Sequence, residues 1–450
     1  MKKVREEDKK QLIRRGEAIF QVILLTVLYY LVWRTYGLDV FPAYYGRGKY
    51  VLMGIYAVLV FLLFHYSDGF KYGHSKLSDI AVSQCISIFL VNFITYWQLS
   101  LIANVMIWPV PVLLLTVVDF IICVVCCYFY TAFYHKYNTP RDLLMIYGSE
   151  NAWDLKTKMS TRSDKYHIAA TIDENTSFEE ICAQITKHDA VLLNDVSAQI
   201  RNDILKFCYG NSIRVYATPK LSDIIISGAE EICLFDTPLL LVKGNGLNLE
   251  QRFVKRTMDI LLSGIAAILT APIMLLVAVA IKLEDGGPVF FKQKRATIDG
   301  KTFEILKFRS MIVDAEKFGE VIPATEKDPR ITKVGNIIRA TRMDELPQIL
   351  NILKGEMSIV GPRPERVEHV EKYSKEIPEF SYRLKVKGGL TGYAQIYGKY
   401  NTSAYDKLRL DLMYIEKYSL LLDIKLILMT LQIMLRKEST EGFQSEEKES

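Results

Sequence analysis

The stretch "FVKRTMDILLSGIAAILTAPIMLLVAVAIKLEDGG", Phe253 to Gly287, decides the fold of the C-terminal half of the chain. Its apolar part, Ile260–Ile281, is long enough for the ~20 residues that a membrane-crossing helix needs. Pro272 lies at its centre, where a proline removes a backbone hydrogen bond and kinks the helix. A kinked helix can enter and leave a membrane on one face if its freed carbonyl finds a partner. The residues therefore leave two alternatives open, an ordinary span with a tolerated proline or a re-entrant helix over 253–282.

The first 135 residues contain long apolar runs with few charges and predict a four-helix transmembrane bundle over residues 1–137. Excess Lys and Arg favour the cytoplasmic side. The basic N-terminus should therefore stay inside, and an even number of spans leaves everything after residue 140 cytoplasmic. The four expected spans are Ile19–Tyr36, Tyr50–Tyr66, Asp79–Trp97 and Pro109–Phe133.

Residues 138–246 predict a Rossmann-like α/β module. Short strand candidates alternate with amphipathic segments, and the strands read "RDLLMIYG", "KYHIAATI", "DAVLLND" and "SIRVYATP". A dinucleotide-binding fold carries three glycines after its first strand, whereas this chain has only Gly148 there. A nucleotide or regulatory ligand site is one interpretation. A structural module without the phosphate-binding loop is the favoured one.

Composition excludes some classes of protein. The net charge of +5 is too small to indicate a nucleic-acid partner, and no basic stripe carries interleaved aromatic residues. Cys123, Cys126 and Cys127 lie in an apolar run with no histidine or acid near them. They could form a redox or zinc site, but small buried hydrophobic residues of a membrane helix are the favoured interpretation.

The stretch "TRMDELPQILNILKGEMSIVGPRP", Thr341 to Pro364, carries the candidate chemistry. Its apolar residues recur at helical spacing, with a glycine as a natural stop. Thr341 and Asp344 match a helix-start signal, and Pro347 fits only a first turn. The sequence therefore predicts Asp344 and Glu345 at a helix N-terminus, where the positive end suits a phosphate and keeps Asp344 ionised.

Cations surround these acids in the sequence. Each proline beside Arg363 fixes its own φ and biases the residue before it toward extended backbone, so the guanidinium is presented rigidly. Fixed carboxylates, arginines and a divalent cation are suited to attack at phosphorus. An amphipathic helix with an acidic cap would explain Asp344 alone but not Arg363. The other nearby cations are Lys307, Arg309, Arg330, Lys333, Arg339 and Arg342.

At this point a family resemblance is specific. The motifs "KRTMD", "GPVFFKQKR", "FEILKFRSM", "DPRITKVGNIIR", "MDELPQILNILKGEMSIVGPRP" and "GGLTGYAQIYG" resemble the bacterial sugar transferases. These are polyprenyl-phosphate glycosylphosphotransferases with a monotopic catalytic core. The resemblance covers about residues 255–437. The N-terminal spans and the Rossmann-like module resemble the long members, which begin exopolysaccharide or O-antigen repeat units.

The resemblance implies a multi-domain membrane protein with an α-rich monotopic catalytic domain at 250–450, whose helix re-enters the membrane and breaks at Pro272. It implies that Asp344 attacks the β-phosphate of a UDP-sugar, that UMP leaves, and that undecaprenyl phosphate then accepts the phosphosugar. Mg²⁺ would be the cofactor, with Asp344 as its ligand, and Glu345 would assist. The implied substrate-binding residues are Arg339, Arg363, Lys307, Arg309, Gln348 and Arg330.

The implied location is the bacterial inner (cytoplasmic) membrane, with the catalytic domain on the cytoplasmic face of the lipid bilayer, and the long members are compatible with a homodimer. Gly388 and Tyr397 depart from the family pattern, so Gly388 would loosen a turn and Tyr397 would alter the sugar pocket. The apolar run 419–435 is expected at the membrane interface, with a buried core helix as the alternative.

Three other functions remain as alternatives. A direct glycosyltransferase would release UDP, and a membrane-anchored regulatory scaffold would have an inactive catalytic half. A transporter would need intramembrane polar groups, of which Asp119 is the clearest; a helix–helix contact is the plainer interpretation of that residue.

Overall fold

A computed structural model describes residues 2–36, 47–72, 76–137, 140–148, 152–313, 328–399 and 402–434 of the chain. The chain divides into two compact units, Met1–Thr218 and Pro219–Ser450, which are taken separately below. Residues 219–246, part of the predicted middle domain, belong to the second unit, where Ile224 shares a core with Val360. The predicted domain boundaries otherwise stay predictions.

Four long helices begin the first unit: α1 (Lys2–Tyr36), α2 (Gly48–Tyr66), α3 (Leu77–Ala103) and α4 (Val110–Tyr137). Each expected span lies within one of them, apart from an end residue. Leu25, Tyr56, Ile88 and Cys123 come one from each helix and lie in one buried core. Within the described residues, five helices are long and apolar enough to cross a membrane, these four and α9 (Leu249–Asp285). The expectation of several apolar spans is confirmed, and their membrane topology stays a prediction.

Polar side chains hold these helices together. Asp119 on α4 is fully buried and accepts hydrogen bonds from Asn92 on α3 (3.0 Å) and from Tyr56 on α2 (3.3 Å). Hydrogen bonds between apolar helices lack competing water, so such pairs fix how the helices pack. Asp119 is therefore a helix–helix contact, as its plainer interpretation predicted. Cys123 and Cys127 are buried free thiols, which agrees with their prediction as small hydrophobic residues.

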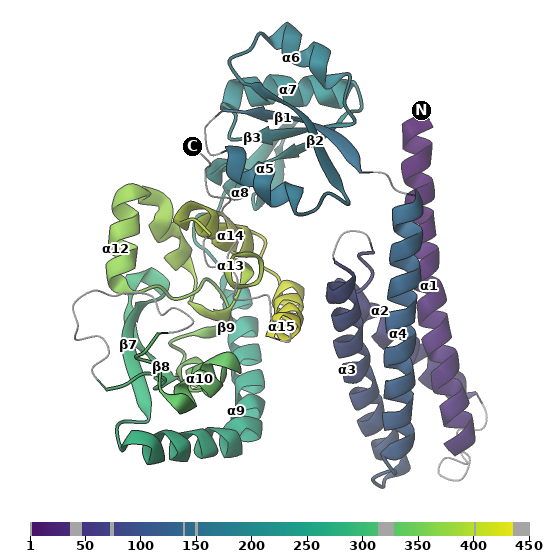
Figure 1. The fold of residues 1–450 in the computed structure, drawn as a ribbon, viewed down its shortest axis with the longest axis vertical. Helices are drawn as coiled ribbons and strands as arrows, with labels where there is room; N and C mark the ends of the chain where they lie inside the picture. Colours follow the sequence, from purple (N-terminus) through teal and green to yellow (C-terminus); the bar gives the residue numbers. More distant parts are fainter. Residues whose placement is uncertain are drawn as a thin grey trace. The chain divides into compact units, whose positions relative to one another are not determined.

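A parallel sheet forms the rest of the first unit. Its strands are β1 (Arg141–Tyr147), β2 (Tyr166–Asp173), β3 (Ala190–Asn194) and β4 (Arg214–Ala217), in the order β2-β1-β3-β4. Figure 1 shows helices on both faces of this sheet, namely α5 (Ala152–Ser160), α6 (Phe178–Ile185) and α7 (Ala198–Gly210). All four strand predictions are confirmed. The strands are parallel because the helix between two strands returns the chain to the end of the sheet at which the previous strand began.

The turn after β1 is filled by protein atoms. A Cβ at Gly148 would lie 2.5 Å from the Asp195 carbonyl oxygen and 2.7 Å from a Glu174 carboxylate oxygen. The Glu174 carboxylate also accepts a 2.6 Å hydrogen bond from the Ser197 backbone N–H, directly before α7. An acid thus fills the space beside the glycine after β1, the turn that in dinucleotide-binding folds lies against the phosphates. This geometry favours the structural interpretation of the module.

The second unit combines helices with small sheets. After α8 (Leu221–Ser227), three pairs of strands form separate two-stranded sheets: β5 (Glu230–Leu234) with β6 (Thr237–Leu241), β7 (Phe290–Ala296) with β8 (Thr302–Phe308), and β9 (Ser358–Val360) with β10 (Gly389–Thr391). The helices that follow α9 are α10 (Lys333–Ala340), α11 (Gln348–Lys354), α12 (Val367–Glu376), α13 (Tyr393–Tyr397), α14 (Ala404–Glu416) and α15 (Leu420–Met434).

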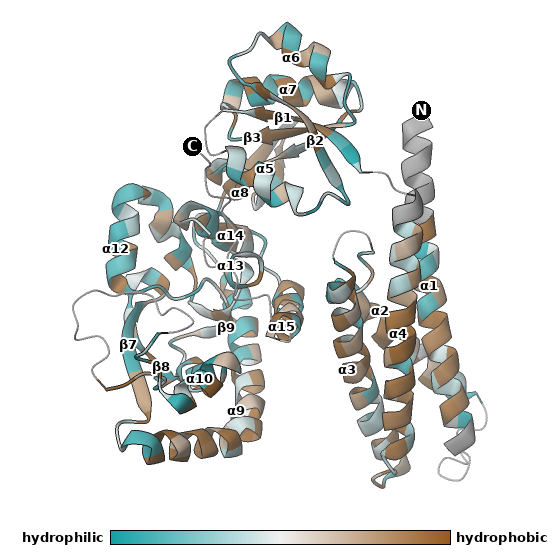
Figure 2. Cartoon of the chain, viewed as in Figure 1, coloured by the Kyte–Doolittle hydropathy of each residue, from teal (hydrophilic) through white to brown (hydrophobic). Residues whose placement is uncertain are grey.

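Helix α9 contains Pro272, and Figure 1 shows it bent into an upright arm and a horizontal arm. Figure 2 shows hydrophobic residues along both arms. Leu261, Ile268 and Leu276 are each more than 60% exposed, although leucine and isoleucine are normally buried. An apolar patch of this kind on a bent helix indicates a surface that contacts lipid or protein.

Helix α15 occupies most of the predicted apolar run 419–435. Leu426 and Leu428 are buried, and Leu426 lies in the core around Val360, whereas Leu421 and Leu431 are more than 40% exposed. The helix therefore has one face in the protein core and apolar residues left uncovered on another. The buried face agrees with the core-helix alternative, and membrane contact by the other face stays a prediction.

Candidate active site

The two acids lie in a short 3₁₀ turn, η3 (Met343–Glu345), between α10 and α11. Thr341 ends α10, since its hydroxyl donates to the Ile337 carbonyl at 2.8 Å, so the predicted helix-start signal is wrong. Helix α11 begins only after Pro347 and ends at Gly355 with a φ of 88°, as the glycine stop predicted. Asp344 and Glu345 therefore precede the helix and do not form its first turn.

The backbone before the acids is strained. Arg342 has a φ of 54°, in the left-handed region, which costs a non-glycine residue about 1–2 kcal/mol. Residues in such conformations cluster at functional sites, because the surrounding structure must hold them there. The turn thus fixes the direction of both carboxylates.

Glu345 is clamped by two cations. Its Oε1 lies 2.6 Å from the Nζ of Lys307 on β8 and 3.4 Å from Nη2 of Arg363. Asp344, by contrast, has no ion pair among the residues that the structure describes. The two neighbouring acids thus differ in their surroundings, because described cations pair with Glu345 and none pairs with Asp344.

The electrostatics of the two acids differ as well. Burial opposes the charge on Glu345, but Lys307 and Arg363 outweigh it and lower its pKa to about 2. For Asp344 burial is the largest influence and raises the pKa; Glu345 adds to the rise, while Lys307 and Arg339 oppose it. Burial thus opposes the stabilisation of the charged form that was expected from a helix end, and an ionised Asp344 stays a prediction. Its carboxylate is more basic than usual, which favours a nucleophile.

Hydrogen bonds hold the loop that carries Arg363, since every backbone carbonyl from residue 362 to residue 365 accepts one. These carbonyls accept from Gly389 N (2.8 Å), Arg383 Nη2 (3.0 Å), Arg295 Nη1 (3.1 Å) and Ala296 N (3.0 Å), in that order. The prolines on both sides of Arg363 are buried, while its own side chain is 48% exposed. The prediction of a rigidly presented guanidinium agrees with this arrangement.

Several of these supports were not predicted as site residues. The Asn351 side chain on α11 accepts from Leu306 N (2.9 Å) and donates to Glu304 O (2.8 Å), which holds α11 against the strand of Lys307. Arg383 is buried against Asp411 at 2.7 Å. No sequence signal marks these contacts, because each partner is more than 25 residues away. Arg295 was quoted within a motif, but its contact with Pro364 could not be foreseen.

Two of the predicted substrate-binding residues have other described partners, and a third is buried. Arg309 pairs with Asp285 at the end of α9, and Arg330 pairs with Asp328 at 2.6 Å within its own turn. Gln348 is buried in the first turn of α11. The structure therefore brings together Lys307, Arg339, Arg363 and the two acids, and it describes no contact of the other three with those acids.

Of the two acids, only Asp344 suits a magnesium ion as a ligand. Among the described residues no three His, Cys, Asp or Glu side chains lie close enough to hold a metal ion. Mg²⁺ commonly uses one or two carboxylates and takes its remaining ligands from water and substrate phosphates. Asp344, which has no described ion pair, fits that limited role, and Glu345 is engaged by cations.

The two departures from the family pattern occupy different surroundings. A Cβ at Gly388 would lie 2.6 Å from Pro364 Cγ, and its N–H donates to Thr297 Oγ1 at 3.3 Å. Gly388 thus permits close packing beneath the arginine loop. Tyr397 is 49% exposed, and its hydroxyl lies 3.6 Å from the sulfur of Met429 on α15. Its effect on a sugar pocket stays a prediction.

Comparisons with known proteins identify the family of this chain. Residues 250–437 match the family model described as Bacterial sugar transferase. The UDP-glucose:undecaprenyl-phosphate glucose-1-phosphate transferase of Klebsiella pneumoniae is 38% identical over 259 residues, covering 56% of this chain and 54% of that protein. The protein of the same name in Escherichia coli (strain K12) is 44% identical over 210 residues, covering 46% and 43%.

This chain thus spans about half the length of those two relatives. A third match extends further. The UDP-N-acetylgalactosamine-undecaprenyl-phosphate N-acetylgalactosaminephosphotransferase of Aeromonas hydrophila is 33% identical over 329 residues, which cover 70% of this chain and 72% of that protein. On these grounds the chain belongs to the bacterial sugar transferase family.

Proposed function

We propose that this protein transfers a sugar 1-phosphate from a UDP-sugar to undecaprenyl phosphate and releases UMP. The observation that carries the proposal is the contrast within the acidic pair. Glu345 holds Lys307 and Arg363 by ion pairs, while Asp344 beside it has none among the described residues and has a raised pKa. Relatives are named for such transfers with glucose and N-acetylgalactosamine donors.

In the first step an Asp344 carboxylate oxygen forms a bond to the β-phosphorus of the donor. The bond from that phosphorus to the bridging oxygen breaks, and UMP leaves with the oxygen and its electron pair. An acyl phosphate that carries the sugar remains on Asp344. The cations of Lys307, Arg339 and Arg363 lower the barrier by stabilising charge that builds on the phosphate oxygens.

In the second step an oxygen of undecaprenyl phosphate attacks the same phosphorus. The bond to Asp344 breaks, so the carboxylate is regenerated and undecaprenyl diphosphate-sugar forms. Glu345 acts by holding Lys307 and Arg363 in place. A bound Mg²⁺, with Asp344 as its protein ligand, would supply positive charge to the diphosphate.

We also propose that the reaction takes place at the bacterial inner membrane. The exposed apolar residues of α9 support membrane contact. The bend of this helix, which contains Pro272, supports its entering and leaving the membrane on the same face. This arrangement suits the chemistry because the sugar nucleotide is soluble in the cytoplasm and the acceptor is a lipid. A homodimer stays a prediction.

The test is to identify the nucleotide released by the purified protein in lipid with Mg²⁺, undecaprenyl phosphate and a panel of UDP-sugars. UDP-glucose and UDP-N-acetylgalactosamine come first. We expect UMP release from wild type and none from Asp344→Ala, and a phosphosugar trapped on the protein when the acceptor is omitted. Release of UDP would replace the proposal with direct glycosyl transfer, and no release with any donor would favour a scaffold.

A further inference from the structure

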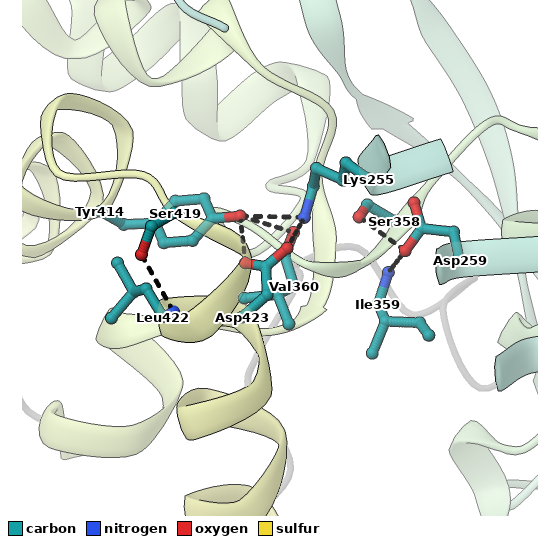
Figure 3. Close-up of polar contacts among 9 residues, drawn as sticks. All are labelled: Lys255, Asp259, Ser358, Ile359, Val360, Tyr414, Ser419, Leu422 and Asp423. Atoms are coloured by element: carbon teal, nitrogen blue, oxygen red, sulfur yellow. Dashed lines mark hydrogen bonds and ion pairs between the residues drawn. The ribbon is translucent and has the colours of Figure 1, made fainter. Parts of the chain in front are cut away.

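A buried polar network links the start of α9 to the strand before Arg363. Lys255, Tyr414 and Asp423 are each no more than 5% exposed. Lys255 Nζ lies 2.6 Å from Asp423 Oδ2 and 2.9 Å from the Tyr414 hydroxyl oxygen. Figure 3 shows the three side chains meeting where α9, α14 and α15 converge.

The same network reaches β9. The Tyr414 hydroxyl lies within donating distance of the Val360 carbonyl (3.2 Å) and of Asp423 Oδ1 (2.8 Å), and its single proton can serve one of them at a time. One turn after Lys255, buried Asp259 accepts from Ser358 Oγ (3.0 Å) and from Ile359 N (2.9 Å). Each residue of β9 thus contacts this network, as Figure 3 shows.

Helix α9 also contacts the helix that follows the acidic pair. Arg256 donates to the Ile352 and Leu353 carbonyls, at 2.6 and 2.7 Å, near the C-terminal end of α11. Helix α9 therefore contacts both segments of the site, α11 through Arg256 and β9 through Asp259, and Lys255 reaches β9 through Tyr414. One segment leads from Glu345 and the other leads to Arg363.

Stability alone does not account for the network. Removing a lysine and an aspartate from water is costly, and a buried ion pair can often be replaced by apolar residues without loss of stability. The polar groups instead hold β9 in place, because Asp259 accepts from Ser358 and Ile359 and the Tyr414 hydroxyl faces the Val360 carbonyl. β9 continues directly into Gly361, and Arg363 follows two residues later.

We infer that Lys255, Tyr414 and Asp423, together with Asp259, are positioning residues that transmit the placement of α9 and α15 to the Arg363 loop. Because α9 and α15 both expose apolar residues, their seating at a lipid surface sets the position of the guanidinium. This inference rests on the proposed function, since Arg363 is assigned there to the phosphates of the sugar nucleotide.

The test compares apolar single variants with the matched pair. Lys255→Met and Asp423→Leu each leave a buried charge uncompensated, whereas the double variant removes both charges. The control is the double variant Lys292→Met with Glu304→Leu, which removes an exposed ion pair of 3.2 Å between β7 and β8. Thermal denaturation, kcat and KM for the UDP-sugar, and amide exchange of residues 358–364 are measured for the full chain in lipid nanodiscs.

We expect the single variants to lower Tm and the buried double variant to recover it. Its KM for the donor should nevertheless stay raised about tenfold or more, with a smaller change in kcat, since small displacements of binding groups have large effects. Amide exchange in residues 358–364 should be faster than in wild type, and the exposed double variant should match wild type throughout. The inference would be overturned if the Lys255→Met, Asp423→Leu double variant folds and shows the wild-type donor KM and wild-type amide exchange at residues 358–364.

Tyr414→Phe keeps the test open if the double variant fails to fold, because it removes only the hydroxyl. We expect faster exchange at residues 358–364 and a raised donor KM, and unchanged values of both would count against the network. Exchange is independent of turnover. If wild type released no UMP, the proposed function would fail while the exchange data still reported on the network.

Discussion

Replacing Lys307 with methionine should destabilise the protein by an amount that the structure allows us to work out. The pKa of Glu345 is lowered from 4.5 to about 2. A difference of about 2.5 in pKa corresponds to ~3 kcal/mol, since each pKa unit is worth about 1.36 kcal/mol. The Glu345 side chain is only 19% exposed, so solvent screening reduces this value little. Lys307 at 2.6 Å is the closer of the two cations and should account for roughly 2 kcal/mol of it.

This stabilisation is present above the unfolded pKa of Glu345 and is lost as pH falls through about 2, because the folded pKa is the lower one. Lys307→Met should therefore lower Tm by the same amount at pH 6 and pH 8. For a unit of this size ~2 kcal/mol corresponds to about 4–8 °C. Adding Glu345→Gln to the Lys307→Met variant should restore most of the lost Tm, because the double variant has no buried carboxylate without its cation.

The assay is thermal denaturation in nanodiscs, with Lys292→Met as control because its ion pair with Glu304 is exposed and should be worth less than ~1 kcal/mol. A wild-type Tm for Lys307→Met would refute the reasoning. So would an equal loss in the double variant, since the loss would then come from something other than an uncompensated carboxylate.

Three further predictions concern the same unit. Lys307→Met should move the acid limb of kcat/KM to higher pH and Glu345→Gln should move it to lower pH, because Lys307 lowers and Glu345 raises the pKa of Asp344; shifts in the same direction would contradict this assignment. Pro272→Ala should straighten α9, and a C-terminal reporter that is active only in the cytoplasm should then lose signal, whereas an unchanged signal would show that re-entry does not need the proline. Gly388→Ala should lower Tm by an amount equivalent to about 1–3 kcal/mol, since its Cβ would lie 2.6 Å from a proline ring, and an unchanged Tm would show that this ring can shift.

Some of the fold was predictable because local periodicity is decided by neighbours in sequence. Apolar runs predicted α1 to α4 and α9, alternating segments predicted the four parallel strands, and Gly355 predicted the end of α11. The capping prediction failed because the same Thr-x-x-Asp pattern also fits a helix that ends at Thr341.

The acids and Arg363 could be found from sequence, since prolines and adjacent carboxylates leave a local mark. The different surroundings of the two acids could not be predicted in this way. They depend on Lys307, which reaches Glu345 from 38 residues away, and on the burial of Asp344. Sequence likewise gave no reason to prefer Lys307 over Arg309, whose described partner is Asp285.

By itself, then, the sequence determined which segments are apolar, where helices and strands form, and which residues could perform chemistry at phosphorus. Only the tertiary structure decided which cations meet the acids and what holds the Arg363 loop. The reason is physical. A pKa and an ion pair depend on the distance and burial of groups brought together by folding, such as Lys255 and Asp423 at 168 residues apart, and no local pattern encodes that distance.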